Sequence, residues 1–96
     1  MQTLLPNTVV YVNVVSECDY LVASAEYFSS EYDPYSIKSV VEMFSQEYTK
    51  YVNTDPDCDE FDKSAAEQVA DCVKRKNYTV CESDDNLVVN IYFLIA

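Results

Sequence analysis

The sequence contains no glycine, no histidine and no tryptophan. Without glycine it cannot form a P-loop or a dinucleotide-binding fingerprint, because both bring glycine backbone close to phosphate. Without histidine it has no Ser-His or Cys-His dyad, no imidazole zinc ligand and no histidine pH switch. Basic residues are scarce as well: six Lys and Arg face 17 Asp and Glu, which gives a net charge of -11. This balance argues against direct binding to nucleic acid or to anionic membranes, which both attract positive charge.

Long hydrophobic runs are also missing. The apolar-rich segments 9–15 and 87–95 are each too short to cross a bilayer as a helix. The first seven residues lack the basic and apolar regions of a secretory signal. We therefore expect one small domain, residues 1–96, in the cytoplasm, or in the host cell cytoplasm if the chain is viral.

Hydrophobic periodicity predicts an α+β domain with the element order β-α-α-α-β-β. The expected strands are 8–15, 78–83 and 87–95, with a turn at 84–86, and the expected helices are 18–32, 34–53 and one whose apolar stripe runs from 61 to 73. The first strand should join the C-terminal hairpin beside strand 87–95. The result would be a two-layer fold, in which two to three helices cover one face of a three-stranded antiparallel or mixed sheet.

The helix boundaries follow from capping patterns. The segment 18–32 is predicted as a helix because Leu21, Ala25, Phe28 and Tyr32 recur at helical spacing. Asp33-Pro34 is typical of a helix start, and the next helix could be capped by Asp59, by Asp62 or by a capping box at Ser64. Asn77 could cap that helix at its C-terminal end.

Catalysis and metal binding have little support in the sequence. Segment 55–62 has carboxylates at the first, third and fifth positions of a calcium loop, but Glu60 replaces the turn glycine and Ala66 replaces the bidentate Glu. A solvated acidic loop or an acidic docking site explains it better. We expect no catalytic residue, no metal site and no cofactor. The four cysteines, Cys18, Cys58, Cys72 and Cys81, are expected to be free and mostly buried thiols in a reducing compartment, although a secreted chain could pair them.

Charge and tyrosine are concentrated together in the first two thirds of the chain. Segment 17–62 holds twelve acidic and two basic residues, while Lys74, Arg75 and Lys76 form one small basic spot. Tyrosine is enriched at interfaces, and carboxylates pair bidentately with Arg, so an exposed mixture of the two suits a basic partner. Several of these tyrosines could instead be core residues, with the acids serving solubility: Tyr48 and Tyr51 fit the apolar stripe of helix 34–53, and Tyr32 fits that of 18–32. The candidate partner-binding residues are Glu26, Tyr27, Glu31, Asp33, Tyr35, Glu42, Glu47, Asp55, Asp57 and Asp59.

These features lead us to expect a small acidic, non-catalytic protein that binds and inhibits a basic protein surface of a nucleic-acid-processing complex. Nucleic-acid mimicry is one way to do so, since DNA carries dense, regularly spaced negative charge. In being short, acidic and without a motif, the chain is similar to viral and mobile-element inhibitors of the anti-restriction and anti-CRISPR type. No residue pattern identifies a family. The alternatives are a self-associating scaffold domain, pairing through Tyr11, Asn13, Asn90 and Tyr92, and a metal- or redox-responsive regulator.

Overall fold

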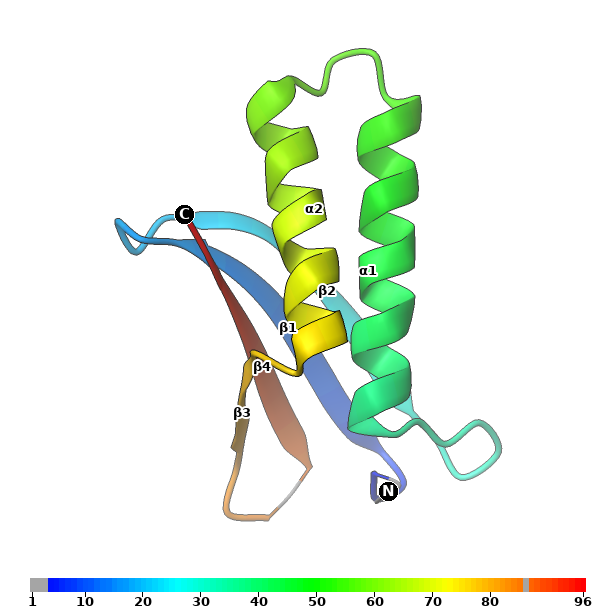
Figure 1. Ribbon diagram of the computed structural model, residues 1–96. Helices are drawn as coiled ribbons and strands as arrows, with labels where there is room; N and C mark the ends of the chain where they lie inside the picture. Colours follow the sequence, from blue (N-terminus) through cyan, green and yellow to red (C-terminus); the bar gives the residue numbers. More distant parts are fainter. Residues whose placement is uncertain (1–3, 86) are drawn as a thin grey trace.

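The computed structural model describes residues 4–85 and 87–96. They form two layers, a mixed four-stranded sheet and a pair of antiparallel helices that lie on one of its faces (Figure 1). In chain order the elements are β1 (Thr8–Ser16), β2 (Leu21–Ser29), α1 (Ile37–Thr54), α2 (Glu60–Arg75), β3 (Thr79–Glu82) and β4 (Val88–Ile95). Within the described residues, neither helix is long and apolar enough to cross a membrane.

The sheet has the order β2-β1-β4-β3, so β1 and β4 are its central strands. They pair in parallel, from Val9 opposite Val88 to Ser16 opposite Ile95, whereas β2 and β3 pair antiparallel with them at the two edges. The central strands are the two that are richest in β-branched residues, whose stiff side chains suit a pleated surface. The predicted placement of the first strand beside the C-terminal one is therefore confirmed.

The predicted number and order of elements is wrong. The structure has four strands and two helices, not three strands and two to three helices, because segment 18–32 forms β2 rather than a helix. Three of the four apolar residues that suggested helical spacing are exposed: Leu21 at 54%, Phe28 at 53% and Tyr32 at 95%. Burial along β2 instead alternates, with Ala23, Ala25, Tyr27 and Ser29 turned toward the helices. This period-two pattern is not visible in the sequence, because the positions of β2 that face the helices hold small or polar residues such as Ala and Ser.

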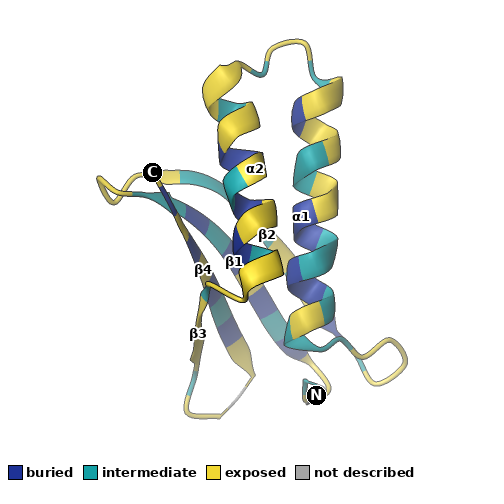
Figure 2. Cartoon of the chain, viewed as in Figure 1, coloured by how far each residue is buried: buried dark blue, intermediate teal, exposed yellow. Residues whose placement is uncertain are grey.

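The hydrophobic core lies between the sheet and the helices, as the buried positions in Figure 2 show. Val10, Val12 and Val14 of β1 meet the buried residues of β4 across the parallel pair. Phe93 is fully buried and stacks against Phe44 of α1, with 6.0 Å between ring centroids. In the last strand, the alternating residues Val89, Ile91, Phe93 and Ile95 all point into the core and are buried.

Both helices start with reciprocal capping, although not where each was expected. The first helix begins after Ser36, whose hydroxyl accepts from Ser39 N–H at 3.1 Å, so Pro34 lies in the preceding loop rather than at the helix start. The second begins after Asp59, one of the three predicted caps, and Asp59 and Asp62 accept from each other's N–H. Its last residue is followed by Lys76 in a left-handed conformation, so Lys76 rather than Asn77 is the C-cap.

The absence of glycine leaves other residues at the positions with positive φ. They are Asn7, Asp19 and Lys76, with φ of 67°, 59° and 57°. Asn and Asp tolerate this region best among residues with a Cβ, whereas Lys does so at some cost. In the β3–β4 connection, the Asp85 carboxylate accepts hydrogen bonds from the Ser83 hydroxyl and from Leu87 N–H. These side-chain hydrogen bonds hold the turn. The predicted turn residue Asn86 lies outside the described residues.

The cap of α1 gives a stability prediction. Ser36→Ala should lower the free energy of unfolding by about 1 kcal/mol, because the N–H of Ser39 loses its acceptor. Chemical denaturation followed by circular dichroism measures the change. Ser64→Ala is the matched control, since Ser64 is exposed inside α2, where Ala is a good helix former. An equal loss of stability in both variants would contradict a specific capping role for Ser36.

Candidate binding groove between β2 and α1

A groove runs between edge strand β2 and helix α1, which passes in front of it in Figure 1. It consists of two adjoining hollows of about 350 Å³ and 280 Å³ that share Ala23, Ser24, Tyr48 and Tyr51. The small side chains of β2 leave this space open, because α1 packs mainly against α2 and the central strands. We call it the α1–β2 groove. Its other lining residues are Val22, Ala25, Phe44, Glu47, Val52, Asp55, Asp57, Cys58 and Asp62.

A cluster of tyrosines and carboxylates continues the groove toward the start of α1. The Tyr27 hydroxyl donates to Glu47 Oε2 at 2.9 Å, and the Tyr35 hydroxyl donates to Asp33 Oδ2 at 3.4 Å. The two rings meet edge to face, with centroids 6.5 Å apart. Four predicted binding residues, Tyr27, Asp33, Tyr35 and Glu47, are thus in direct contact. They come from β2, from the β2–α1 loop and from α1.

The carboxylates act on the phenols beside them. Burial, followed by the hydrogen bond to Glu47 and its charge, raises the pKa of Tyr27. The pKa of Tyr35 is raised first by the charge of Asp33. Burial and then the charge of Asp62 raise the pKa of Tyr48, and the hydrogen bond and charge of Asp55 raise that of Tyr51. The phenols therefore remain protonated donors in a negative environment at neutral pH.

Cys58 belongs to the α1–α2 loop, which closes one end of the groove. Its partial burial, and then the charges of four surrounding aspartates, raise the pKa of its thiol. Asp55 has the largest of these charge effects, followed by Asp62, Asp59 and Asp57. All four carboxylates therefore lie close enough to act on this thiol, and three of them, Asp55, Asp57 and Asp62, also line the groove.

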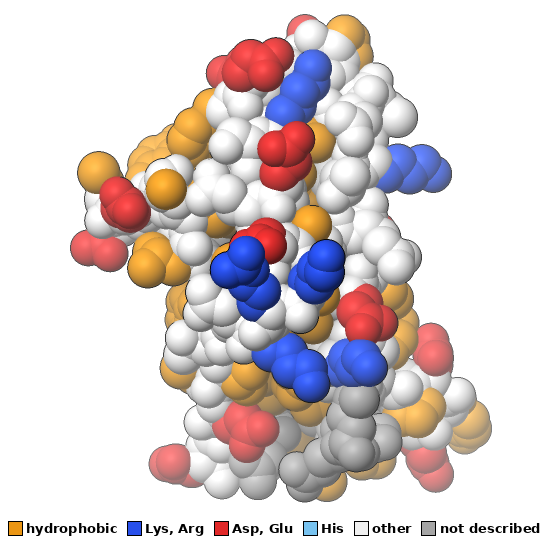
Figure 3. Space-filling view, viewed as in Figure 1, with side chains coloured by type: hydrophobic (Ala, Val, Ile, Leu, Met, Phe, Trp, Pro, Cys, Tyr) orange, Lys and Arg blue, Asp and Glu red, His pale blue; other side chains and the backbone are white. Residues whose placement is uncertain are grey.

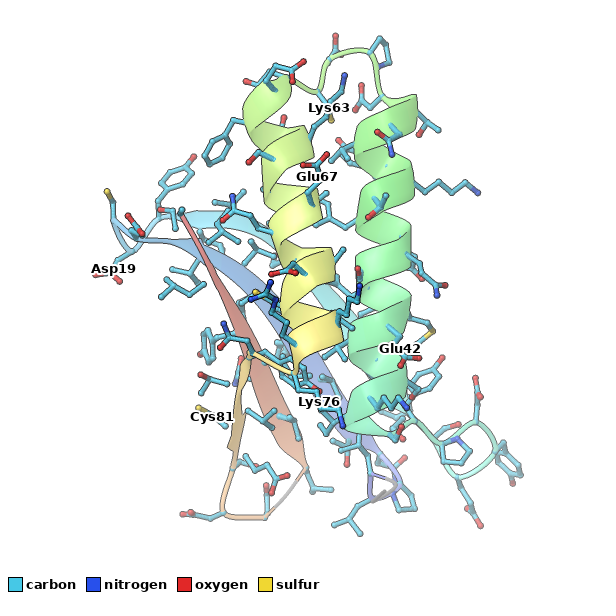
Figure 4. The ribbon with its side chains drawn as sticks, viewed as in Figure 1. Asp19, Glu42, Lys63, Glu67, Lys76 and Cys81 are labelled. Atoms are coloured by element: carbon cyan, nitrogen blue, oxygen red, sulfur yellow. The ribbon has the colours of Figure 1, made fainter. Side chains whose placement is uncertain are left out.

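The remaining candidate residues lie elsewhere. Glu26 is on the outer face of the sheet, opposite Tyr11 of β1. Glu31 is exposed in the β2–α1 loop, and Asp59 is the cap of α2. Glu42 lies near Lys76 at the adjoining ends of the helices, where both line a third hollow with Lys38 (Figure 4). The structure thus brings together six of the ten candidates along the α1–β2 side, and three of them, Glu47, Asp55 and Asp57, line the groove itself.

The front of the helix layer is not uniformly acidic. Figure 3 shows basic side chains gathered over the lower half of the helices, with acidic ones between them. Arg75 forms an exposed ion pair with Asp71, at 3.1 Å between Nε and Oδ1. The acidic residues of segment 17–62 also extend to Asp19, at the far tip of the β1–β2 hairpin in Figure 4. Negative charge is therefore concentrated locally and does not cover one whole face.

The acidic loop has local structural roles. Asp55 Oδ1 accepts from Asp57 N–H at 2.9 Å, and Asp59 and Asp62 cap α2. In the described part of the chain, no group of three or more His, Cys, Asp or Glu side chains is arranged to hold a metal ion. All four cysteines are free thiols, but the expectation that most of them are buried is wrong: only Cys72 is buried, and Cys18 and Cys81 are exposed.

Most of the residues that line the groove were not among the candidate binding residues named from the sequence. Tyr48 and Tyr51 were assigned to the apolar stripe of α1, but Tyr51 is 57% exposed and both face the groove. Asp62 was considered as a possible cap and as the end of acidic segment 55–62, but it was not among the candidate binding residues. The available signal was the spacing of Tyr51, Asp55 and Cys58, which places a phenol one helical turn before the acidic loop. Ala23 and Ser24 could not be found while that segment was assigned to a helix.

The reactivity of Cys58 tests the electrostatics of the groove. Because its thiol pKa is raised, we expect slow alkylation by iodoacetamide at pH 8, since the thiolate is the nucleophile. Asp55→Asn keeps the acceptor for Asp57 N–H but removes one charge, and should speed the reaction about two- to threefold. Mass spectrometry of the labelled cysteines measures the rate. Asp84→Asn, on the distant β3–β4 turn, is the control and should leave the alkylation rate of Cys58 unchanged. If Asp55→Asn and Asp84→Asn are alkylated at the same rate, the charge of Asp55 does not act on Cys58.

Comparison of the chain with known protein families, curated protein sequences and solved structures found no match. The functional argument therefore depends on the geometry of the groove and on its charge.

Proposed function

We propose that the protein is a non-catalytic binding protein that holds a basic part of a partner protein in its α1–β2 groove. The observation that supports this is the convergence of tyrosines and carboxylates around the two adjoining hollows of the groove. Tyr48 and Tyr51 lie in the groove beside Glu47, Asp55 and Asp62.

This combination matches the side chains of Arg and Lys part by part. Their methylene stems pack on apolar surface such as Ala23 and Phe44, while the charged head stays near solvent. A guanidinium or ammonium group over a tyrosine ring gains a cation–π interaction of about 0.5–2 kcal/mol. Carboxylates such as Asp55 and Asp62 then accept charge-assisted hydrogen bonds from the head group. A neutral or acidic ligand would gain none of these contacts.

Inhibition follows if the bound residues are those with which the partner contacts nucleic acid. Occupying the phosphate-binding Arg and Lys side chains removes the main source of affinity for nucleic acid. Broad mimicry of a nucleic-acid backbone is less well supported, because the helix layer is mixed in charge (Figure 3). A local groove that captures a few basic side chains fits the charge distribution better. An anti-defence inhibitor of a restriction or CRISPR complex is one protein that would act in this way.

Charge removal within the groove tests the proposal. Glu47→Gln and Asp62→Asn keep the side-chain shape and an acceptor oxygen, and each should weaken binding of a capped Arg-rich peptide about three- to tenfold. The dependence of affinity on salt should also flatten. Fluorescence anisotropy or calorimetry at low and high salt measures both effects. Glu67→Gln, on α2 outside the groove lining, is the charge-matched control. If all three variants bind alike, the groove is not the binding site.

A second candidate, self-association, is favoured by the outer face of the sheet, which no element covers in the described part of the chain. Phe28, Leu94 and Tyr92 are exposed there at 53%, 66% and 40%. At its centre Asn13 Nδ2 donates to Asn90 Oδ1 and Ile91 O at 3.5 and 3.3 Å. These two amides contact each other on neighbouring strands, which would lower the cost of burying them against a second copy.

Analytical ultracentrifugation separates this candidate from the first. Self-association through the outer face predicts a dimer whose size is insensitive to salt, since the buried contacts would be mainly apolar. Leu94→Lys should dissociate it by placing a charge in that face, and Lys50→Leu, on the opposite layer, should not. A monomer at every salt concentration and protein concentration tested would exclude this candidate and leave the first intact.

A further inference from the structure

The open edge of β2 is long and weakly protected. β2 pairs only with β1 among the described strands and contains nine residues, of which Glu26 alone is charged. Exposed edge strands are usually protected by short length, by Lys or Pro, or by a covering element, because their free backbone groups accept another chain. The opposite edge, β3, has only four residues and carries exposed Glu82. The two edges therefore differ, and only that of β2 can accommodate a strand of ordinary length.

The backbone groups available at this edge follow from the pairing. Val9 N–H donates to Leu87 O at 2.8 Å, so the odd-numbered residues of β1 point their backbone groups toward β4 and the even-numbered ones toward β2. The β2 partners of those even residues include Ala23, Ala25 and Tyr27. The intervening residues Ser24, Glu26 and Phe28 must then present N–H and C=O to the open edge. These groups form a template for one more strand.

The same edge borders the α1–β2 groove, to which Ser24 contributes. We propose that a basic, extended segment of the partner adds to β2 as a fifth strand and places Arg or Lys side chains at alternate positions in the groove. This inference depends on the proposed function and specifies its binding mode. It joins two independent features, an unpaired strand edge and an acidic, tyrosine-lined hollow beneath it.

The geometry of a strand fits this arrangement. An added strand would lie about 4.8 Å from β2, and its side chains would alternate between the two faces of the sheet at about 7 Å between neighbours on one face. Those on the helix side would enter the groove, where Tyr48, Tyr51 and Asp62 lie. Those on the other side would meet Phe28, which is half-exposed on the outer face. Main-chain hydrogen bonds would supply affinity and the groove would supply specificity.

Charge favours a basic partner over a second copy of the chain at this edge. A symmetric pairing of β2 with β2 would join two molecules that each carry a net charge of -11. It would also bring two acidic grooves together, and the repulsion between them would oppose association. A segment with several Arg or Lys residues removes this repulsion and replaces it with steering toward the groove.

Two capped peptides of the length of β2 test the inference directly. One alternates Arg with Thr, and the other alternates Arg with Pro, so both carry the same charge but the second lacks half of its N–H groups. The Arg-Thr peptide should bind at least about tenfold more tightly. Amide hydrogen exchange of the intact protein should slow at Ser24, Glu26 and Phe28 when it binds. Equal affinity of the two peptides would overturn strand addition.

Variants of Ser24 provide the matched test. Ser24→Pro removes an N–H that faces the open edge without removing a hydrogen bond to β1, and Ser24→Ala keeps that N–H. Only Ser24→Pro should weaken the Arg-Thr peptide, and circular dichroism checks that it remains folded. If it unfolds, hydrogen exchange of the unmodified protein with the peptide still decides the question.

The outcomes also separate this inference from the proposed function. If Asp62→Asn weakens binding of both peptides while Ser24→Pro weakens binding of neither, the acidic groove does bind basic side chains but strand addition is wrong. If neither peptide binds, both proposals fail. If exchange at the β2 edge slows with protein concentration alone, a second copy occupies the edge and the inference of a basic segment is overturned.

Discussion

The parallel pairing of β1 with β4 is the interaction on which the rest of the structure depends. It joins two segments that lie near opposite ends of the sequence, and it contributes Val10, Val12, Val14, Ile91 and Phe93 to the core. Because parallel neighbours need a crossover connection, the chain between them must pass over one face of the sheet, and it does so as α1 and α2. The antiparallel neighbours β2 and β3 then have no position left except the two edges.

The candidate site is a consequence of that arrangement. Helix α1 places Phe44 over the central strands, where it stacks on Phe93 and its burial stabilises the fold. In its first half, edge strand β2 turns only the small side chains of Ala23 and Ala25 toward the helices. The space between β2 and α1 is therefore not filled. Polar and aromatic side chains at the end of α1 line this space. The groove thus exists because the core is centred on β1 and β4 and not on the whole sheet.

The sequence was informative where burial and local pattern agree. The central strands and both helices have long, regular apolar patterns, and their predicted positions match the structure closely. β2 was missed because Leu21, Phe28 and Tyr32 are exposed, so their spacing carries no information about the core. Small residues such as Ala23 and Ala25 have little preference for strands, and only pairing with β1 makes them one. Tertiary context, which a single sequence does not display, decided this segment.

The candidate site was only partly predictable for a related reason. The cluster of Tyr27 and Glu47 joins two segments 20 residues apart, and the sequence suggested both residue types without showing that they touch. The tyrosines of α1 fitted a helical stripe, and helical spacing alone does not distinguish a side chain in the core from one that lines a groove. That distinction depends on what lies opposite the helix. Here the neighbour is a strand of small residues, so Tyr48 and Tyr51 border open space.

The aspartates of the groove serve both folding and charge, and this dual role explains why the acidic loop is so dense. Without glycine, the α1–α2 connection obtains its turns from side-chain hydrogen bonds, and Asp55, Asp59 and Asp62 each accept one from a neighbouring N–H. Asn would accept the same bonds without self-repulsion, which destabilises a compact chain of net charge -11. Turn formation alone therefore explains why side-chain acceptor oxygens are needed in this loop, but not why the side chains that carry them are charged. At Asp59 and Asp62 the charge also suits the N-terminus of α2, where the helix dipole favours negative groups. Asp55, Asp62 and Glu47 line the groove beside β2 with Tyr48 and Tyr51, and theirs is the charge that the proposed basic partner would meet.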